Sequence, residues 1–190
     1  MKKLCLIVSL LCSVVLGANA QDYETPSDEI SVGWGLLSIP NMAGVLSFAA
    51  SSIISDDIEY GMATGAITAQ YMHNFNDKLG IGISGTYESV KAEQKNIDWT
   101  DKYVSIMPTV RYKWLRREKI AVYSRVAAGV LINSYEDHSD ILKSEKKTDT
   151  EFGWQVSLGG VEYGNKKLSG FLEGGFGYQG LVIAGVRLGL

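Results

Sequence analysis

Apolar and polar residues alternate with a period of two along most of the chain. Between Lys102 and Trp114, the even positions from Val104 onward are apolar and the odd positions are mostly polar. Successive side chains of a β-strand point to opposite faces of the sheet, so this period predicts strands with one apolar and one polar face. Eight segments follow the pattern, at residues 29–37, 60–75, 79–92, 102–114, 120–135, 150–163, 168–177 and 180–190. The sequence therefore predicts an all-β fold.

The connections between these segments fall into two kinds. Short polar turns are predicted near residues 76–78, 116–118 and 165–166, and another short turn at 178–180. Longer connections are predicted at 38–59, 93–101 and 136–149. Outer-membrane barrels have short periplasmic turns and longer external loops. The pattern predicts an eight-stranded antiparallel up-and-down transmembrane β-barrel, although a soluble barrel that encloses a ligand would alternate in the same way.

Aromatic residues on the apolar faces lie near the strand ends. Membrane barrels place aromatic side chains in two girdles at the two lipid–water interfaces, with aliphatic residues between them. A soluble core gives aromatic residues no reason to avoid the middle of a strand, so this distribution favours the membrane barrel. The girdle predicted at the short-turn end contains Tyr71, Phe75, Tyr112, Trp114 and Tyr163. The girdle predicted at the long-loop end contains Tyr87, Phe152, Trp154, Phe176 and Tyr178.

The polar faces are rich in Gly, Ser and Thr, as the narrow lumen of an eight-stranded barrel requires. They also carry a predicted lumen charge network of Glu88, Arg111, Arg125, Glu162, Glu173 and Arg187. Folding the hairpins back predicts that Arg125 lies opposite Glu162, and that Arg187 lies diagonal to Glu173. Because an unpaired buried charge is costly, the network is interpreted as a plug that closes the lumen. The alternative interpretation is a gate or a selectivity ring.

The chain ends in an apolar strand, LVIAGVRLGL. Lipid cannot satisfy an open sheet edge, so a membrane barrel must pair this strand with the first one, at residues 29–37. With this closure, residues 29–190 resemble the small eight-stranded outer-membrane proteins of the OmpX/OmpA-barrel type. The resemblance implies that Gly185, Leu188 and Leu190 form a signal for the barrel-assembly machinery, with Leu190 in place of the usual terminal aromatic residue.

The first residues have the composition of a secretory signal peptide. Lys2 and Lys3 precede an apolar run, and Ala-Asn-Ala at 18–20 forms a cleavage site. The predicted organisation is a cleaved signal peptide at 1–20, a short lead at 21–28 and a barrel at 29–190. Both cysteines of the chain lie in the signal peptide, so no disulfide is expected. Export by this signal predicts the outer membrane of a Gram-negative-type bacterium.

Candidate chemistry outside the lumen is sparse. His138 and Ser139 lie together in a charged loop, and His73 lies near a short-turn end on the apolar register. Neither position has the rigid support that catalysis needs, and no metal-ligand spacing is present. No enzyme activity, cofactor or metal is therefore expected. The apolar segment 39–54, IPNMAGVLSFAASSII, has Pro40-Asn41 as a helix start and is interpreted either as a cap on the barrel or as a contact surface.

These patterns predict a closed-lumen barrel with a structural role or a role in surface adhesion or recognition through its long loops. A small-solute channel and a lipid-modifying enzyme are the alternatives. The expected partners are outer-membrane lipid, the barrel-assembly machinery and a surface ligand of unknown identity. The formal net charge of −3 leaves no basic stripe for nucleic acid, and the barrel is expected to be a monomer.

Overall fold

The computed structural model describes residues 25–43, 58–59, 64–94, 97–137 and 146–190. The predicted signal peptide at 1–20 and most of the lead at 21–28 lie outside the described residues. The strands are β1 (Asp28–Leu36), β2 (Ile58–Glu59), β3 (Ala66–Asn74), β4 (Leu79–Gln94), β5 (Ile97–Arg116), β6 (Ile120–Asp137), β7 (Lys146–Gly164), β8 (Leu168–Gly177) and β9 (Val182–Gly189). None of the described residues form a helix long enough and apolar enough to cross a membrane.

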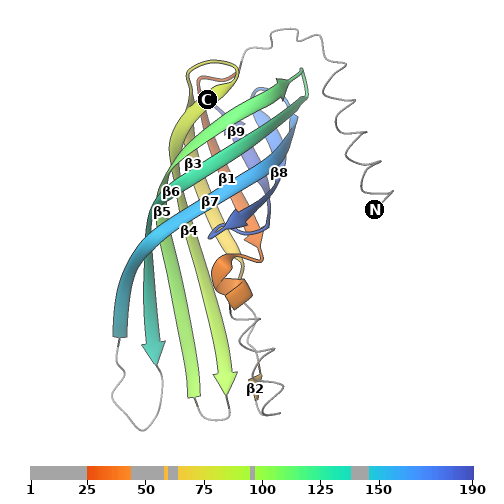
Figure 1. Cartoon of the computed structure of the whole chain (residues 1–190). Helices are drawn as coiled ribbons and strands as arrows, with labels where there is room; N and C mark the ends of the chain where they lie inside the picture. The colour runs from red at the N-terminus through yellow and green to blue at the C-terminus, as the bar shows by residue number, and fades with distance from the viewer. Residues whose placement is uncertain (1–24, 44–57, 60–63, 95–96, 138–145) are drawn as a thin grey trace.

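All strands except the two-residue β2 form one closed antiparallel barrel (Figure 1). Strands β3 to β8 each pair with the next strand along the chain, and β1 lies between β3 and β9. The β1–β9 ladder runs from Glu29 opposite Gly189 to Leu36 opposite Val182. This closure confirms the predicted eight-stranded up-and-down barrel, in which the apolar strand β9 has its edge paired with the first strand.

The barrel has its polar face inside and its apolar face outside. Along β1, the side chains of Ile30, Val32 and Trp34 expose 43–55% of their surface, whereas Glu29 and Ser31 expose 5% or less. The same alternation marks β3, in which every second residue is buried. A soluble barrel would bury its apolar face, so this inside-out arrangement is that of a barrel whose outer surface lies in lipid.

Four neighbouring strands are about twice as long as the others. Strands β4 to β7 contain 16, 20, 18 and 19 residues, whereas β1, β3, β8 and β9 contain 9, 9, 10 and 8. Figure 1 shows them extending past the barrel at the long-loop end. We call this extension, at residues 89–94, 97–102, 134–137 and 146–148, the external sheet.

The external sheet corrects the predicted loops at 93–101 and 136–149. The β4–β5 ladder continues to Gln94 opposite Ile97, and the β6–β7 ladder continues to Glu136 opposite Lys146. The prediction ended these strands where their apolar alternation stopped. Above the lipid no apolar face is required, so the backbone hydrogen-bond ladder continues through polar sequence. Residues 95–96 and 138–145 lie outside the described residues.

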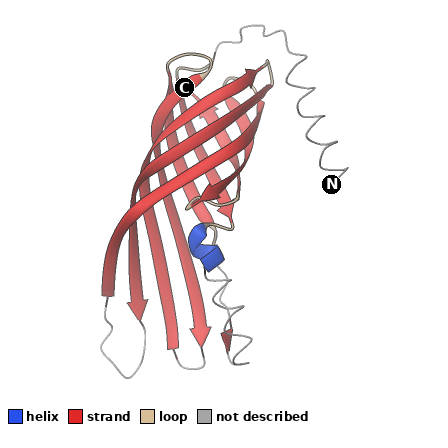
Figure 2. Ribbon diagram, in the orientation of Figure 1, coloured by secondary structure: helices blue, strands red, loops and turns tan. Residues whose placement is uncertain are grey.

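Two further segments differ from or extend the prediction. The strand predicted at 60–75 begins only at Ala66, because Gly65 has a φ of +74°, in the left-handed region outside strand geometry. Residues 39–43 are helical, with the Asn41 amide donating to Ser38 Oγ at 3.2 Å and the Met42 amide to Ser38 O at 2.8 Å. Figure 2 shows this helix at the long-loop end of the barrel. The rest of the 38–59 connection lies outside the described residues, except for β2.

Candidate functional site

The structure places all the residues of the predicted lumen charge network inside the barrel. Each of them exposes 5% or less of its surface. They come from six consecutive strands: Glu88 from β4, Arg111 from β5, Arg125 from β6, Glu162 from β7, Glu173 from β8 and Arg187 from β9. Burial of six formal charges in one narrow core requires compensation within the core itself.

The first group of lumen charges lies near the short-turn end and is built on Glu29. Arg111 donates from Nη2 to Glu29 Oε2, and Lys113 donates from Nζ to Glu29 Oε1 at 3.2 Å. Arg187 lies between two carboxylates, with its Nε 3.5 Å from Glu29 and its Nη1 bonded to Glu162. The sequence reasoning missed Glu29 and Lys113, although Lys113 shares the polar face of β5 with Arg111, and Glu29 lies on the face of β1 that carries Ser31.

The second group of lumen charges is built on Glu173. Arg125 donates to Glu173 Oε2 from Nε at 2.9 Å and from Nη2 at 2.6 Å, which is a two-point contact. The Tyr123 hydroxyl donates to Glu173 Oε1 at 2.8 Å, and the Ser157 hydroxyl donates to Oε2 at 2.7 Å. Two charged and two neutral contacts thus satisfy one carboxylate without solvent.

Two arginines of the lumen have each other's predicted carboxylate partner. Arg125 pairs with Glu173 instead of Glu162, and Arg187 pairs with Glu162 instead of Glu173. The β6–β7 ladder sets these partners, because Arg125 lies opposite Ser157 and Glu162 lies opposite Ala121, four residues nearer the short-turn end. Strand β7 also carries one extra residue between Ser157 and Gly160 relative to both neighbouring strands, so Ser157 and Glu162 are both buried in the lumen although one position is odd and the other even. The predicted pairing placed Arg125 opposite Glu162 and was wrong.

Aromatic rings inside the lumen join the two groups of charges. The guanidinium carbons of Arg111 and Arg187 lie 5.5 and 5.2 Å from the centre of the Tyr123 ring. Arg187 also lies 5.0 Å from the centre of the Phe171 ring. These distances are in the range of cation–π contacts. Because the Tyr123 hydroxyl bonds to Glu173, this one side chain contacts both groups.

Gln179 reaches into the lumen from the long-loop side. It lies in the turn between β8 and β9, yet exposes only 1% of its surface. Its Oε1 accepts from Arg125 Nη1 at 2.7 Å, and its Nε2 donates to Ser84 Oγ at 3.2 Å and to Thr86 Oγ1 at 3.0 Å. Gln155 accepts from the Gln179 amide at 2.9 Å. The sequence reasoning treated Gln179 as an ordinary turn residue, because nothing in its local pattern indicates an inward side chain.

Glu88 stands apart from the two charge groups. Its Oε2 accepts from the Ser38 hydroxyl at 2.5 Å, and its Oε1 has no hydrogen-bond partner among the described residues. Ser38 also caps the helix at 39–43. Glu88 therefore ties the segment after β1 to the inner wall of β4.

A polar recess lies at the short-turn mouth of the lumen. Its empty volume of about 170 Å³ includes open solvent, and its lining includes Glu29, Arg116, Glu162 and Arg187. Arg116 lies 3.5 Å from Glu162. The recess therefore borders the first group of lumen charges.

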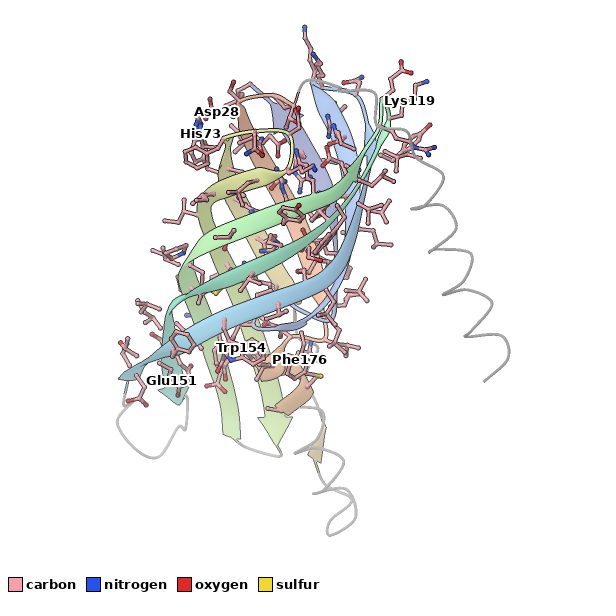
Figure 3. The ribbon with its side chains drawn as sticks, turned by 45° about the horizontal axis from the view of Figure 1, so that its top comes forward. Asp28, His73, Lys119, Glu151, Trp154 and Phe176 are labelled. Atoms are coloured by element: carbon pink, nitrogen blue, oxygen red, sulfur yellow. The ribbon has the colours of Figure 1, made fainter. Side chains whose placement is uncertain are left out.

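The residues of the two predicted aromatic girdles point outward. Eight of the ten side chains are exposed, and Trp154 and Tyr178 are half-buried. Figure 3 shows Trp154 and Phe176 near the long-loop end; their ring centres are 5.6 Å apart. At the other end, the indole Nε1 of Trp114 donates to Ser124 Oγ at 2.9 Å. The Trp114 ring faces outward while its N–H is hydrogen-bonded within the protein, which is the arrangement expected of an aromatic residue at a lipid–water interface.

Of the candidate residues outside the lumen, the structure describes His73 but not His138 or Ser139. His73 lies outward near the short-turn end, where its Nδ1 is 2.9 Å from Asp28 Oδ1. His138 and Ser139 lie outside the described residues. Within the described residues, no group of three or more His, Cys, Asp and Glu side chains is placed to hold a metal ion.

Comparison with known proteins gives a family for the fold. The outer membrane protein beta-barrel domain model matches residues 8–183. Among curated proteins nothing matches. Two crystal structures of Ail, the attachment invasion locus protein of Yersinia pestis, are similar. One, in complex with the heparin analogue sucrose octasulfate, has 13% identity and a TM-score of 0.44, and the alignment covers 88% of this chain and 95% of Ail. The other has 14% identity, a TM-score of 0.45, and 86% and 95% coverage.

The N-terminal β-barrel domain of Pseudomonas aeruginosa OprF is also similar, with 8% identity and a TM-score of 0.43. The alignment covers 87% of this chain and 98% of that domain.

Proposed function

Because the chain belongs to the outer membrane protein β-barrel family, we propose that it is a surface recognition or adhesion protein whose lumen is closed. In this function the barrel anchors the protein in the outer membrane, and the external sheet presents a binding surface outside the cell. Residues 1–20 direct export, and the C-terminal strand with Gly185, Leu188 and Leu190 directs assembly of a monomeric barrel.

The length of strands β4 to β7 carries this proposal. A tilted strand needs about 9–11 residues to cross the membrane, and β5 contains 20. The additional residues pair with one another as far as Gln94 and Glu136. An ordered sheet held above the lipid is a more defined contact surface than a flexible loop, because less conformational entropy is lost when a partner binds.

The two alternatives have less support. A small-solute channel requires a continuous path, and the described lumen is crossed by the Arg187–Glu162 pair and by Gln179. A lipid-modifying enzyme requires a nucleophile held near a base on rigid strands. The only His in the described residues, His73, bonds to the carboxylate of Asp28 and not to a hydroxyl nucleophile.

Shortening the β4–β5 hairpin tests the proposed function. Val90 and Asp101 are directly opposite in the ladder, so an Asn-Gly turn can replace residues 91–100 without changing the register below them. Cells that express the shortened protein are expected to lose adhesion to a fixed epithelial monolayer and to fall to the level of cells without the protein. Adherent cells are counted after washing, and a heat-modifiable gel band verifies that the barrel has folded.

The control changes the opposite end of the barrel. Lys167→Ala alters an exposed residue of a short turn and is expected to leave adhesion unchanged. Wild-type adhesion by a folded protein with the shortened hairpin would contradict the proposed role of the external sheet.

A further inference from the structure

A polar cluster interrupts the lipid-facing surface of the barrel at its short-turn end. Asp28 begins β1 and lies opposite His73 of β3. The Tyr71 hydroxyl donates to Asp28 Oδ1 at 2.6 Å, and His73 Nδ1 lies 2.9 Å from the same oxygen. Figure 3 shows Asp28 and His73 next to each other at this end of the barrel. The outward positions of β1 beyond Asp28 are apolar, so this cluster stands out on the surface that lipid covers.

The cluster leaves one carboxylate oxygen without a partner among the described residues. Both hydrogen bonds given for Asp28 in the described part of the chain end on Oδ1, and Oδ2 accepts none there. Since an ionised carboxylate only accepts hydrogen bonds, the proton of the shared contact is on His73 Nδ1. The Asp28 and His73 side chains expose 34% and 46% of their surface. The cluster therefore offers the Oδ2 oxygen of Asp28 to whatever covers it.

The neighbouring aromatic residues place the Asp28 carboxylate at the level of lipid headgroups. Phe75 packs edge-on against His73 with ring centres 5.0 Å apart, and Tyr71 and Phe75 are exposed members of the short-turn girdle. Aromatic girdles mark the interface between the acyl chains and water. Nearby, Asp77 is occupied by the Thr25 amide at 3.0 Å. A carboxylate beside aromatic rings at this depth is complementary to a cationic headgroup. The carboxylate has the opposite charge, and the faces of the aromatic rings attract cations.

We propose that Asp28, Tyr71, His73 and Phe75 form a binding site for the ammonium headgroup of phosphatidylethanolamine in the periplasmic leaflet. The ammonium donates to Asp28 Oδ2 and lies against the girdle rings. Tyr71 and His73 hold the carboxylate in place through Oδ1. An anionic headgroup is repelled by Asp28, and a trimethylated headgroup has no N–H to donate. This site lies at the opposite end of the barrel from the external sheet, so it is independent of the adhesion proposal.

Native mass spectrometry of the folded full chain tests the site. The protein is incubated in detergent with equal amounts of phosphatidylethanolamine and phosphatidylcholine that carry the same acyl chains, and the retained lipids are counted. We expect about fivefold more retained phosphatidylethanolamine, the size of effect of one exposed ionic hydrogen bond. Asp28→Asn is expected to reduce the ratio to about one. Glu118→Gln removes another exposed carboxylate at the same end and is expected to keep the wild-type ratio.

A second variant keeps the test valid if Asp28→Asn fails to fold. His73→Phe preserves an aromatic ring, removes the hydrogen bond that holds the Asp28 carboxylate, and is expected to lower the ratio as well. Equal retention of the two lipids by the wild type would overturn the proposal. An unchanged ratio in folded Asp28→Asn, or an equal loss in Glu118→Gln, would do the same, the latter because it would show a general effect of surface charge.

Discussion

Replacing Arg125 with methionine is expected to lower the free energy of unfolding by about 3–5 kcal/mol, the usual cost of removing one partner from a buried ion pair. The substitution leaves the Glu173 carboxylate in a closed lumen with only the hydroxyls of Tyr123 and Ser157 as donors. It also removes the donor to Gln179 Oε1. Urea unfolding of the barrel in lipid vesicles, followed by tryptophan fluorescence, measures the loss.

The double variant separates a charge effect from a packing effect. Arg125→Met combined with Glu173→Gln removes both charges, so it is expected to be less destabilised than Arg125→Met alone. Arg117→Met, at an exposed turn position, is expected to change stability by no more than about 0.5 kcal/mol. If the double variant proves less stable than Arg125→Met, the pair does not act through compensated charge, and the plug needs another explanation.

Replacing Val110 with arginine is expected to cost about 2–4 kcal/mol, because a cation near the middle of the bilayer loses its hydration. Val110 lies outward on β5, with 45% of its surface exposed, and it pairs with Ile81 and Val126, two other outward residues. The cost should depend on depth. Leu168→Arg, at the first residue of β8, is expected to cost only about 0–1 kcal/mol, since the side chain reaches the interface.

Folding titrations into vesicles measure this difference. Val110→Met, which keeps an apolar side chain at the same depth, is expected to fold as the wild type does. A similar cost for arginine at positions 110 and 168 would show that the apolar surface does not lie in lipid at the depth that the strand pairing implies.

The fold was predictable from the sequence because period-two alternation is a local property of each strand. The outward residues Ile30, Val32 and Trp34 and the inward residue Glu29 can be assigned without knowing which strands are neighbours. Closure follows because lipid does not tolerate an open edge. Lys113 could have been assigned to the lumen from the same alternation, since it shares a face with Arg111.

The partners inside the lumen were not predictable in the same way. They depend on register, and the β6–β7 ladder places Glu162 opposite Ala121, four residues from Arg125. Gln179 enters the lumen through the geometry of a turn, and its contacts are with residues on three other strands, 24 to 95 positions away in sequence. The external sheet was missed because strand pairing above the membrane leaves no apolar alternation in the sequence.

Single-channel recording in planar lipid bilayers tests the closed lumen most directly. The barrel is inserted into the bilayer and the current is recorded across a range of voltages. The Arg187–Glu162 and Arg125–Glu173 pairs, with Gln179 above them, predict no stepwise conductance from the wild-type protein. Stable, uniform conductance steps from the folded wild-type barrel would contradict the closed lumen and support the small-solute channel instead.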